Sequence, residues 1–278
     1  MNTTLKKVAV VTYGAVAYMS FAAALFYLMG FLVNVGVPKG IDTGATGPLV
    51  PSLAIDIALV ALFGLQHTVM ARPGFKEVWT KLVPKPIERS TYVIATFLVM
   101  ALMFWQWRPI PTVVWRLDST AGQAVMQLLY LGGYAIVALA TFMINHFDLF
   151  GLRQVYLHAR GERYRPLPFQ TKGFYNYARH PLMAGWILTF WATPVMTVGH
   201  VVFAAAATGY ILIALVYEER DLIRFHGHRY EDYKRQVNAF LPLRKFRAPS
   251  PELAPTTAAG AIPSFEPICD APSHSPRP

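Results

Sequence analysis

Three short polar clusters in the second half of the chain carry the side chains best suited to chemistry. They cover residues 145–154 (NHFDLFGLRQ), 175–186 (YNYARHPLMAGW) and 218–221 (EERD). Together they combine imidazole, carboxylate, guanidinium and amide groups with aromatic rings at the edges of apolar stretches. Such groups can hold a polar ligand through charge-assisted hydrogen bonds and can move a proton at a reacting atom. Residue type and position therefore favour a ligand site beside an apolar wall.

An apolar stretch from Pro181 to Tyr217 separates the second cluster from the third. It is longer than one membrane-spanning helix of about 20 residues, and Pro, Thr, Gly and His residues between 194 and 200 interrupt it near its middle. Helix breakers are tolerated inside a membrane where neighbouring helices or water satisfy the backbone groups. The stretch therefore predicts a helical hairpin with arms at 182–196 and 201–217, the first arm being short for a full crossing.

The two ends of such a hairpin lie on the same side of the membrane. Arg179 and His180 precede its first arm, and Glu218 and Glu219 follow its second arm. We therefore expect these four side chains to be neighbours although they are far apart in the sequence.

The remaining elements must hold this site in a bilayer. The chain has 278 residues, of which 54% are hydrophobic and only 14% charged, whereas a soluble domain has about 25% charged residues. Apolar stretches of helical length precede the hairpin at 8–33, 49–70, 90–107 and 123–144. We expect an all-α fold, a polytopic integral membrane helical bundle with about five to six transmembrane segments. A cytoplasmic amphipathic helix over 220–243 should follow the C-terminal hairpin.

The basic residues lie between apolar runs rather than on one face, so the net charge of +10 does not indicate a nucleic-acid partner. Of the 25 Lys and Arg residues, only Lys39, Arg108 and Arg116 fall in the loops that a six-segment layout places outside. The positive-inside rule then puts both termini in the cytoplasm.

Domain organisation follows from composition. Residues 1–247 form the expected membrane-embedded domain, with the C-terminal part at about 146–243, and residues 248–278 form a Pro/Ala/Ser-rich tail expected to be disordered. Cys269 is the only cysteine, so neither a disulfide within the chain nor a cysteine-based metal site is expected. His226 and His228 are two positions apart and do not share a helix face, so no metal site is expected there either.

Several motifs occur in the order typical of one enzyme superfamily. Arg-His-Pro-x-x-x-Gly from 179, Glu-Glu-Arg-Asp-Leu from 218, Phe-x-Gly-x-x-Tyr-x-x-Tyr from 225 and Phe-Leu-Pro from 240 resemble the isoprenylcysteine carboxyl methyltransferase and phospholipid methyltransferase superfamily. More narrowly, Gln66-His67-x-x-Met-Ala-Arg, the 145–154 cluster and Pro-Leu-Pro-Phe from 166 resemble the bacterial methanethiol S-methyltransferases. This narrower resemblance extends from Gln66 to Pro242.

The resemblance implies transfer of a methyl group from S-adenosyl-L-methionine to a small thiol, giving dimethyl sulfide from methanethiol, in the bacterial inner (cytoplasmic) membrane. It implies a cofactor site formed by Tyr175, Arg179, His180, Pro181, Gly185, Glu218 and Glu219. We expect the substrate side to include Gln66, Asn145, Arg153 and Gln154. Glycine at 185 would let the helix backbone approach a neighbour closely.

Methylation of a thiol requires a base, because the thiolate is the nucleophile. The candidates are His67, His146 and Asp148. The thiol, which is small and membrane-permeable, would arrive through the bilayer and the polar cofactor from the cytosol.

Other interpretations stay open at this point. The substrate could be an isoprenylcysteine carboxylate or a lipid amine, and membrane reductases that bind NADPH share the C-terminal pattern. A non-enzymatic membrane accessory protein is a further alternative. Each candidate residue also has a structural interpretation: Arg179 with Glu218 or Glu219 as an ion pair closing the hairpin, and His146 and Asp148 as helix caps.

Overall fold

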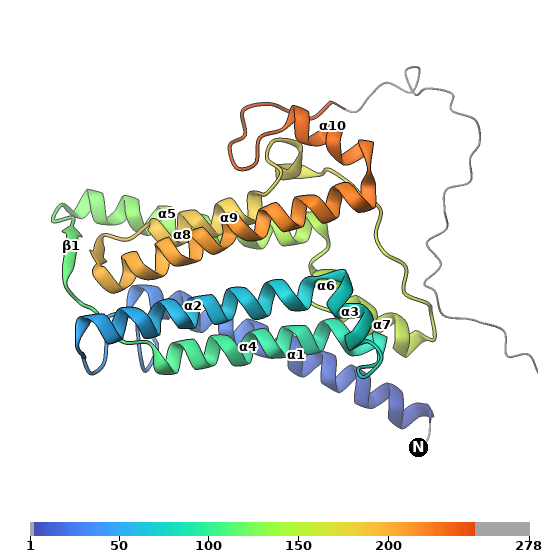
Figure 1. Cartoon of the computed structure of the whole chain (residues 1–278). Coiled ribbons are helices and arrows are strands. Elements are labelled where there is room, and N and C mark those ends of the chain that lie inside the picture. Colours follow the sequence, from blue (N-terminus) through green and yellow to red (C-terminus); the bar gives the residue numbers. More distant parts are fainter. Residues whose placement is uncertain (1–2, 248–278) are drawn as a thin grey trace, which may run out of the picture. The chain divides into compact units, whose positions relative to one another are not determined.

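The computed structural model describes residues 3–247, which are mostly helical (Figure 1). Five helices of this part are long and apolar enough to cross a membrane. They are α1 (Thr3–Val33), α2 (Leu49–Ala71), α4 (Glu88–Gln106), α5 (Thr120–Ile144) and α9 (Val198–His226). The chain is therefore a multi-pass membrane protein, as its composition predicts. The predicted tail over 248–278 lies outside the described residues.

The loops gather at two opposite ends of the helix bundle (Figure 1). At one end, called the sheet end here, β1 (Val113–Arg116) pairs antiparallel with β2 (Val195–Thr197). The other, called the charged end, carries the start of α1 and six short helical elements. These are α3 (Pro73–Trp79), η1 (Lys85–Ile87), α6 (His146–Leu149), α7 (Leu152–Arg160), η2 (Gly173–Asn176) and α10 (His228–Gln236).

The first arm of the predicted hairpin is shorter than expected. It forms α8 (Pro181–Trp191), whose 11 residues span about 16 Å, roughly half of the hydrocarbon core of a bilayer. The prediction that this arm continues to residue 196 is wrong, because the chain is extended after α8 and its backbone groups bond to β1 instead of to a helical turn. The carbonyl of Pro194, for example, accepts from the Leu117 amide at 2.9 Å.

Helices α5 and α8 pack at backbone distance. A Cβ atom on Gly185 would lie 2.8 Å from the carbonyl oxygen of Gly133, and one on Gly133 would lie 2.2 Å from Oγ1 of Thr189. Small residues allow such close approach between membrane helices. This contact brings the start of α8, and with it His180, beside the end of α5.

The second arm is one continuous helix. The prediction of a separate amphipathic helix over 220–243 is wrong in its bounds, because α9 runs on through Glu218 and Glu219 to His226. Gly227 ends it with a φ of +54°, a left-handed conformation that favours glycine, and α10 follows. The two glutamates therefore stand on a regular helix rather than at a helix end.

Candidate functional site

Glu219 is the centre of an ion-pair group that we call the clasp, made of Arg179, His180, Glu219 and Lys234. Oε1 of Glu219 lies 2.8 Å from Nε of Arg179 and 3.1 Å from Nε2 of His180, and Oε2 lies 2.7 Å from Nζ of Lys234. The expected proximity of the hairpin's two ends is thus confirmed. Three groups already bond this carboxylate, and its side chain is only 13% exposed. Glu219 therefore ties the end of the second arm to the residues before the first arm.

Backbone hydrogen bonds hold the segment that carries Arg179 and His180 in place. The amides of Arg179 and His180 donate to the carbonyls of Asn238 and Ala239 at 2.9 and 2.8 Å. The guanidinium of Arg179 also donates to the carbonyl of Val237. The segment after α10 therefore fixes the position and direction of both side chains.

Glu218 differs from its neighbour. Its side chain is 43% exposed, and its one ion-pair contact in the described part of the chain is Nδ1 of His180 at 4.0 Å. Burial raises the pKa of Tyr175 on η2, and the nearby charge of Glu218 raises it further. Tyr230 on α10 is buried, and its hydroxyl has no partner within residues 3–247. Glu218 and Tyr230 therefore retain hydrogen-bonding capacity that a ligand can use.

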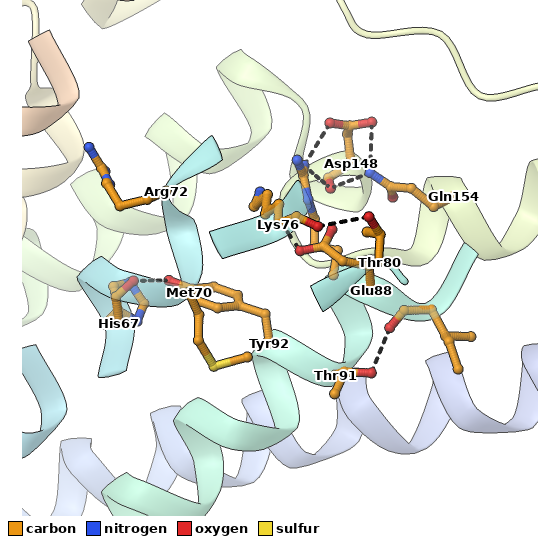
Figure 2. A network of polar contacts seen from close by, with 12 residues as sticks. His67, Met70, Arg72, Lys76, Thr80, Glu88, Thr91, Tyr92, Asp148 and Gln154 are labelled. Carbon is orange, nitrogen blue, oxygen red and sulfur yellow. Dashed lines mark hydrogen bonds and ion pairs between the residues drawn. The ribbon is translucent and has the colours of Figure 1, made fainter. Parts of the chain in front are cut away.

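His67 lies in the last turns of α2, surrounded by aromatic rings. Phe63 stacks on it at a centroid distance of 5.2 Å, Tyr92 lies at 5.0 Å, and Tyr210 stands edge-on at 6.4 Å. Figure 2 shows His67 beside Tyr92 of α4, whose hydroxyl donates to the His67 carbonyl at 3.4 Å. Phe63, His67, Tyr92, Thr96 and Tyr210 are called the His67 cluster below.

The hydrogen bonds of Thr96 indicate which ring nitrogen of His67 carries the proton. The hydroxyl of Thr96 donates to the carbonyl of Tyr92 at 3.0 Å, so it can only accept from Nδ1 of His67, at 3.4 Å. Nε2 then keeps its lone pair, and no hydrogen bond to it is found across residues 3–247. Gln66 donates to the same Thr96 oxygen at 3.3 Å, and its own Oε1 is buried without a partner there.

Arg72 connects the His67 cluster to the hairpin. This residue follows α2, and its guanidinium lies 2.8 Å from the carboxylate of Asp221, one turn beyond Glu218 on α9. Helices α2 and α9 pack against each other on this side of the bundle. The His67 cluster and the partly exposed Glu218 therefore belong to paired helices that both lead to the charged end.

His146 is oriented in a similar way, but both of its nitrogens are engaged. Thr141 donates to the carbonyl of Ala138 at 2.7 Å and so accepts from Nδ1 of His146 at 2.9 Å. The hydroxyl of Tyr18 on α1 then donates to Nε2 at 2.8 Å. Burial lowers the pKa of His146, which favours its neutral form. This imidazole ties α1 to the end of α5.

Asp148 is the centre of a separate network that joins α4, α6 and α7. Its carboxylate lies 3.0 Å from Arg89 and 2.9 Å from Arg153, and the amide of Gln154 lies within 3.4 Å (Figure 2). Asn145 accepts from its backbone amide at 2.9 Å. One carboxylate oxygen is bonded to Arg89 and the other to Arg153, so both are already occupied. The geometry favours a structural role for these four predicted site residues.

Two further predicted residues, Pro181 and Gly185, have structural explanations on α8. Pro181 is the first residue of α8, where its missing N–H costs nothing. The closest neighbours of Gly185 belong to α5, which accounts for glycine at that position without a ligand.

Sequence reasoning missed five residues, Tyr92, Thr96, Tyr210, Tyr230 and Lys234. Tyr92 and Thr96 are polar residues four positions apart in an apolar helix, a spacing that puts both on one face. Lys234 directly follows the Phe-x-Gly-x-x-Tyr-x-x-Tyr motif. Both signals were present in the sequence, although neither identified a partner.

Comparison with known proteins gives several close relatives. The chain is 49% identical over 241 residues to a methanethiol S-methyltransferase of Crocosphaera subtropica, covering 87% of this chain and 94% of the relative. It is 46% identical over 238 residues to that of Mycobacterium tuberculosis, covering 86% and 98%. Nurim of Mus musculus is a more distant match, 28% identical over 183 residues, 63% of this chain and 69% of nurim. No family model and no solved structure matches the chain.

Proposed function

Because this chain belongs to the methanethiol S-methyltransferase family, we propose that it methylates methanethiol with S-adenosylmethionine to give dimethyl sulfide. One observation carries the proposal. A partly exposed glutamate next to a closed clasp stands on α9, and the paired helix α2 carries an oriented histidine with an available nitrogen. The first suits a polar, positively charged cofactor and the second suits a thiol that must lose a proton.

The side chains near Glu218 fit S-adenosylmethionine by their chemistry. That cofactor has a sulfonium, an α-amino group, a carboxylate, two ribose hydroxyls and an adenine. Glu218 can accept from the hydroxyls or the amino group, and the hydroxyl of Tyr230, buried without a partner among the described residues, can donate or accept. We assign Glu218, Tyr175 and Tyr230 to cofactor contact. Arg179 and His180 are both bonded to Glu219 within the clasp, so we assign these two residues to positioning.

The clasp prepares this site before any ligand binds. Glu219 is bonded by its three partners and holds one face of α9 against α10 and against the segment that precedes α8. The adjacent Glu218 therefore needs little reorganisation to meet a ligand, which lowers the entropic cost of binding. When bound, S-adenosylmethionine supplies an electrophilic methyl group on its sulfonium sulfur.

His67 is the proposed general base. Its Nδ1–H is held by Thr96, so Nε2 can accept the thiol proton. The S–H bond breaks as the proton passes to Nε2, and sulfur retains the electron pair as a thiolate. Phe63, Tyr92 and Tyr210 around the ring exclude water, which would otherwise solvate the thiolate and weaken it as a nucleophile.

We further propose that the charged end faces the cytoplasm of the bacterial inner membrane. Lys39, Arg108 and Arg116 are the basic residues in the loops at the sheet end, and the positive-inside rule favours that arrangement. The cofactor would then enter from the cytoplasm, while methanethiol, small and apolar, would cross the bilayer.

The test uses the full chain purified in detergent. Methanethiol and S-adenosylmethionine are supplied, and dimethyl sulfide in the headspace is measured by gas chromatography. Formation of dimethyl sulfide that depends on both compounds is expected. Methylation of an isoprenylcysteine carboxylate or a lipid amine in place of methanethiol, or no methyl transfer at all, would contradict the proposal.

A further inference from the structure

Tyr210 lies unusually close to α2, in a space that only glycine leaves open. A Cβ atom on Gly64 would lie 2.6 Å from Cδ2 of the Tyr210 ring, and 3.1 and 3.2 Å from two further ring atoms. Real Cβ atoms do not approach carbons this closely, so the ring occupies the place that any other residue at position 64 would fill. The backbone of α2 thus forms one face of the site where this ring lies.

The ring of Tyr210 has a second contact on α2. It stands edge-on to Phe63 at a centroid distance of 5.7 Å, one position before Gly64. Contacts with two successive residues of α2 restrict the movement of the ring. Tyr210 is therefore a fixed wall rather than a mobile side chain.

This wall borders the nitrogen proposed as the base. Phe63 is stacked on the His67 ring, Thr96 lies at Nδ1, and Tyr92 and Tyr210 also contact the ring. A thiol sulfur within hydrogen-bonding distance of Nε2 would place its alkyl chain beside these aromatic rings. We propose that Tyr210, held against Gly64 and Phe63, limits the substrate to thiols with a very short alkyl chain. The inference rests on the proposed function of His67.

The experiment compares methanethiol, ethanethiol, 1-propanethiol and 1-butanethiol as substrates of the full chain in detergent. The methyl alkyl sulfide products are measured in the headspace, and kcat/KM is obtained for each. An apolar site separates substrates that differ by one methylene by roughly 10- to 200-fold. The wild-type chain is therefore expected to lose at least about tenfold in kcat/KM by 1-propanethiol. Tyr210→Ala is expected to raise the ratio of 1-propanethiol to methanethiol about tenfold or more.

The matched control is Tyr217→Ala, one heptad further along α9, where the side chain is 45% exposed. Its ratio of 1-propanethiol to methanethiol should equal that of the wild type. An unchanged ratio in Tyr210→Ala, or a wild type that accepts 1-butanethiol as well as methanethiol, would overturn the inference. If Tyr210→Ala does not accumulate in the membrane, Tyr210→Leu keeps an apolar side chain without the ring, and the same ratio decides.

These outcomes are separate from failure of the proposed function itself. A wild type that methylates no thiol would reject the proposed function, whereas a wild type active on all four thiols alike would reject only the role of Tyr210.

Discussion

His67 and His146 have nearly the same local environment and differ in one hydrogen bond. In both, Nδ1 faces a threonine hydroxyl whose own proton goes to a backbone carbonyl. Both rings also contact phenylalanine and tyrosine rings. At Nε2 they diverge: Tyr18 donates to His146 at 2.8 Å, whereas the described residues offer His67 no such donor.

The difference teaches that orientation alone does not make a base. A histidine held by a threonine has a defined tautomer in either place, but a lone pair that already accepts a proton from tyrosine is unavailable to a substrate. Tyr210 of the His67 cluster also stands on α9, the helix that carries Glu218. By this comparison His67 is suited to chemistry and His146 to holding helices together.

Replacing each histidine by alanine tests the difference between His67 and His146 most directly. His67→Ala should lower kcat/KM for methanethiol by about 10²–10⁴-fold, the usual contribution of general base catalysis. His146→Ala should lower it far less once the rate is corrected for folded protein. The loss in His67→Ala should shrink as the pH approaches the pKa of the thiol, because the substrate then ionises without a base. Equal losses in the two variants, at all pH values, would contradict the assignment.

The neighbouring glutamates provide a second matched pair. Glu218→Gln should weaken binding of S-adenosylhomocysteine about 10- to 100-fold, since a hydrogen bond to a charged group contributes roughly 1.5–3 kcal/mol, while thermal stability stays close to wild type. Glu219→Gln should instead lower the free energy of unfolding by about 3–5 kcal/mol, because three clasp partners lose a buried charge. Isothermal titration in detergent and thermal unfolding measure the two effects. Lost stability in Glu218→Gln and weakened ligand binding in Glu219→Gln would mean that Glu219 contacts the cofactor and Glu218 stabilises the fold.

The sequence could predict the meeting of Arg179, His180 and the glutamates, because a hairpin must return to the side where it began. It could not separate Glu218 from Glu219, since Lys234 and the pairing of 179–180 with 238–239 decide that. Nor could it separate His67 from His146. That distinction depends on Tyr18, which lies 128 positions before His146 and reaches it only in the folded bundle. Local motifs carry the chemistry, and long-range contacts determine which residue is available.

Asp148→Asn should test whether the network at α6 is structural. Arg89 and Arg153 would lose the charge that they share, and because the carboxylate is only 12% exposed, the free energy of unfolding should fall by about 2–4 kcal/mol. The folded fraction should keep kcat for methanethiol within a few-fold of wild type. The measurements are thermal unfolding in detergent and the dimethyl sulfide assay below the transition. If Asp148→Asn kept wild-type stability but lost its activity on methanethiol, Asp148 would again be a candidate for the general base.

The smallest expected effect is a pH dependence of stability from His146. Burial lowers its pKa in the folded chain below the usual value of 6.5. Its contribution to stability is therefore complete above about pH 6.5 and is lost as the pH falls through the folded-state pKa, because the unfolded chain binds the proton more readily. Tm should consequently decrease between pH 7 and pH 5, and His146→Gln should decrease less over the same range. Parallel curves for the two proteins would mean that another group causes the pH dependence, and that burial does not hold this imidazole neutral.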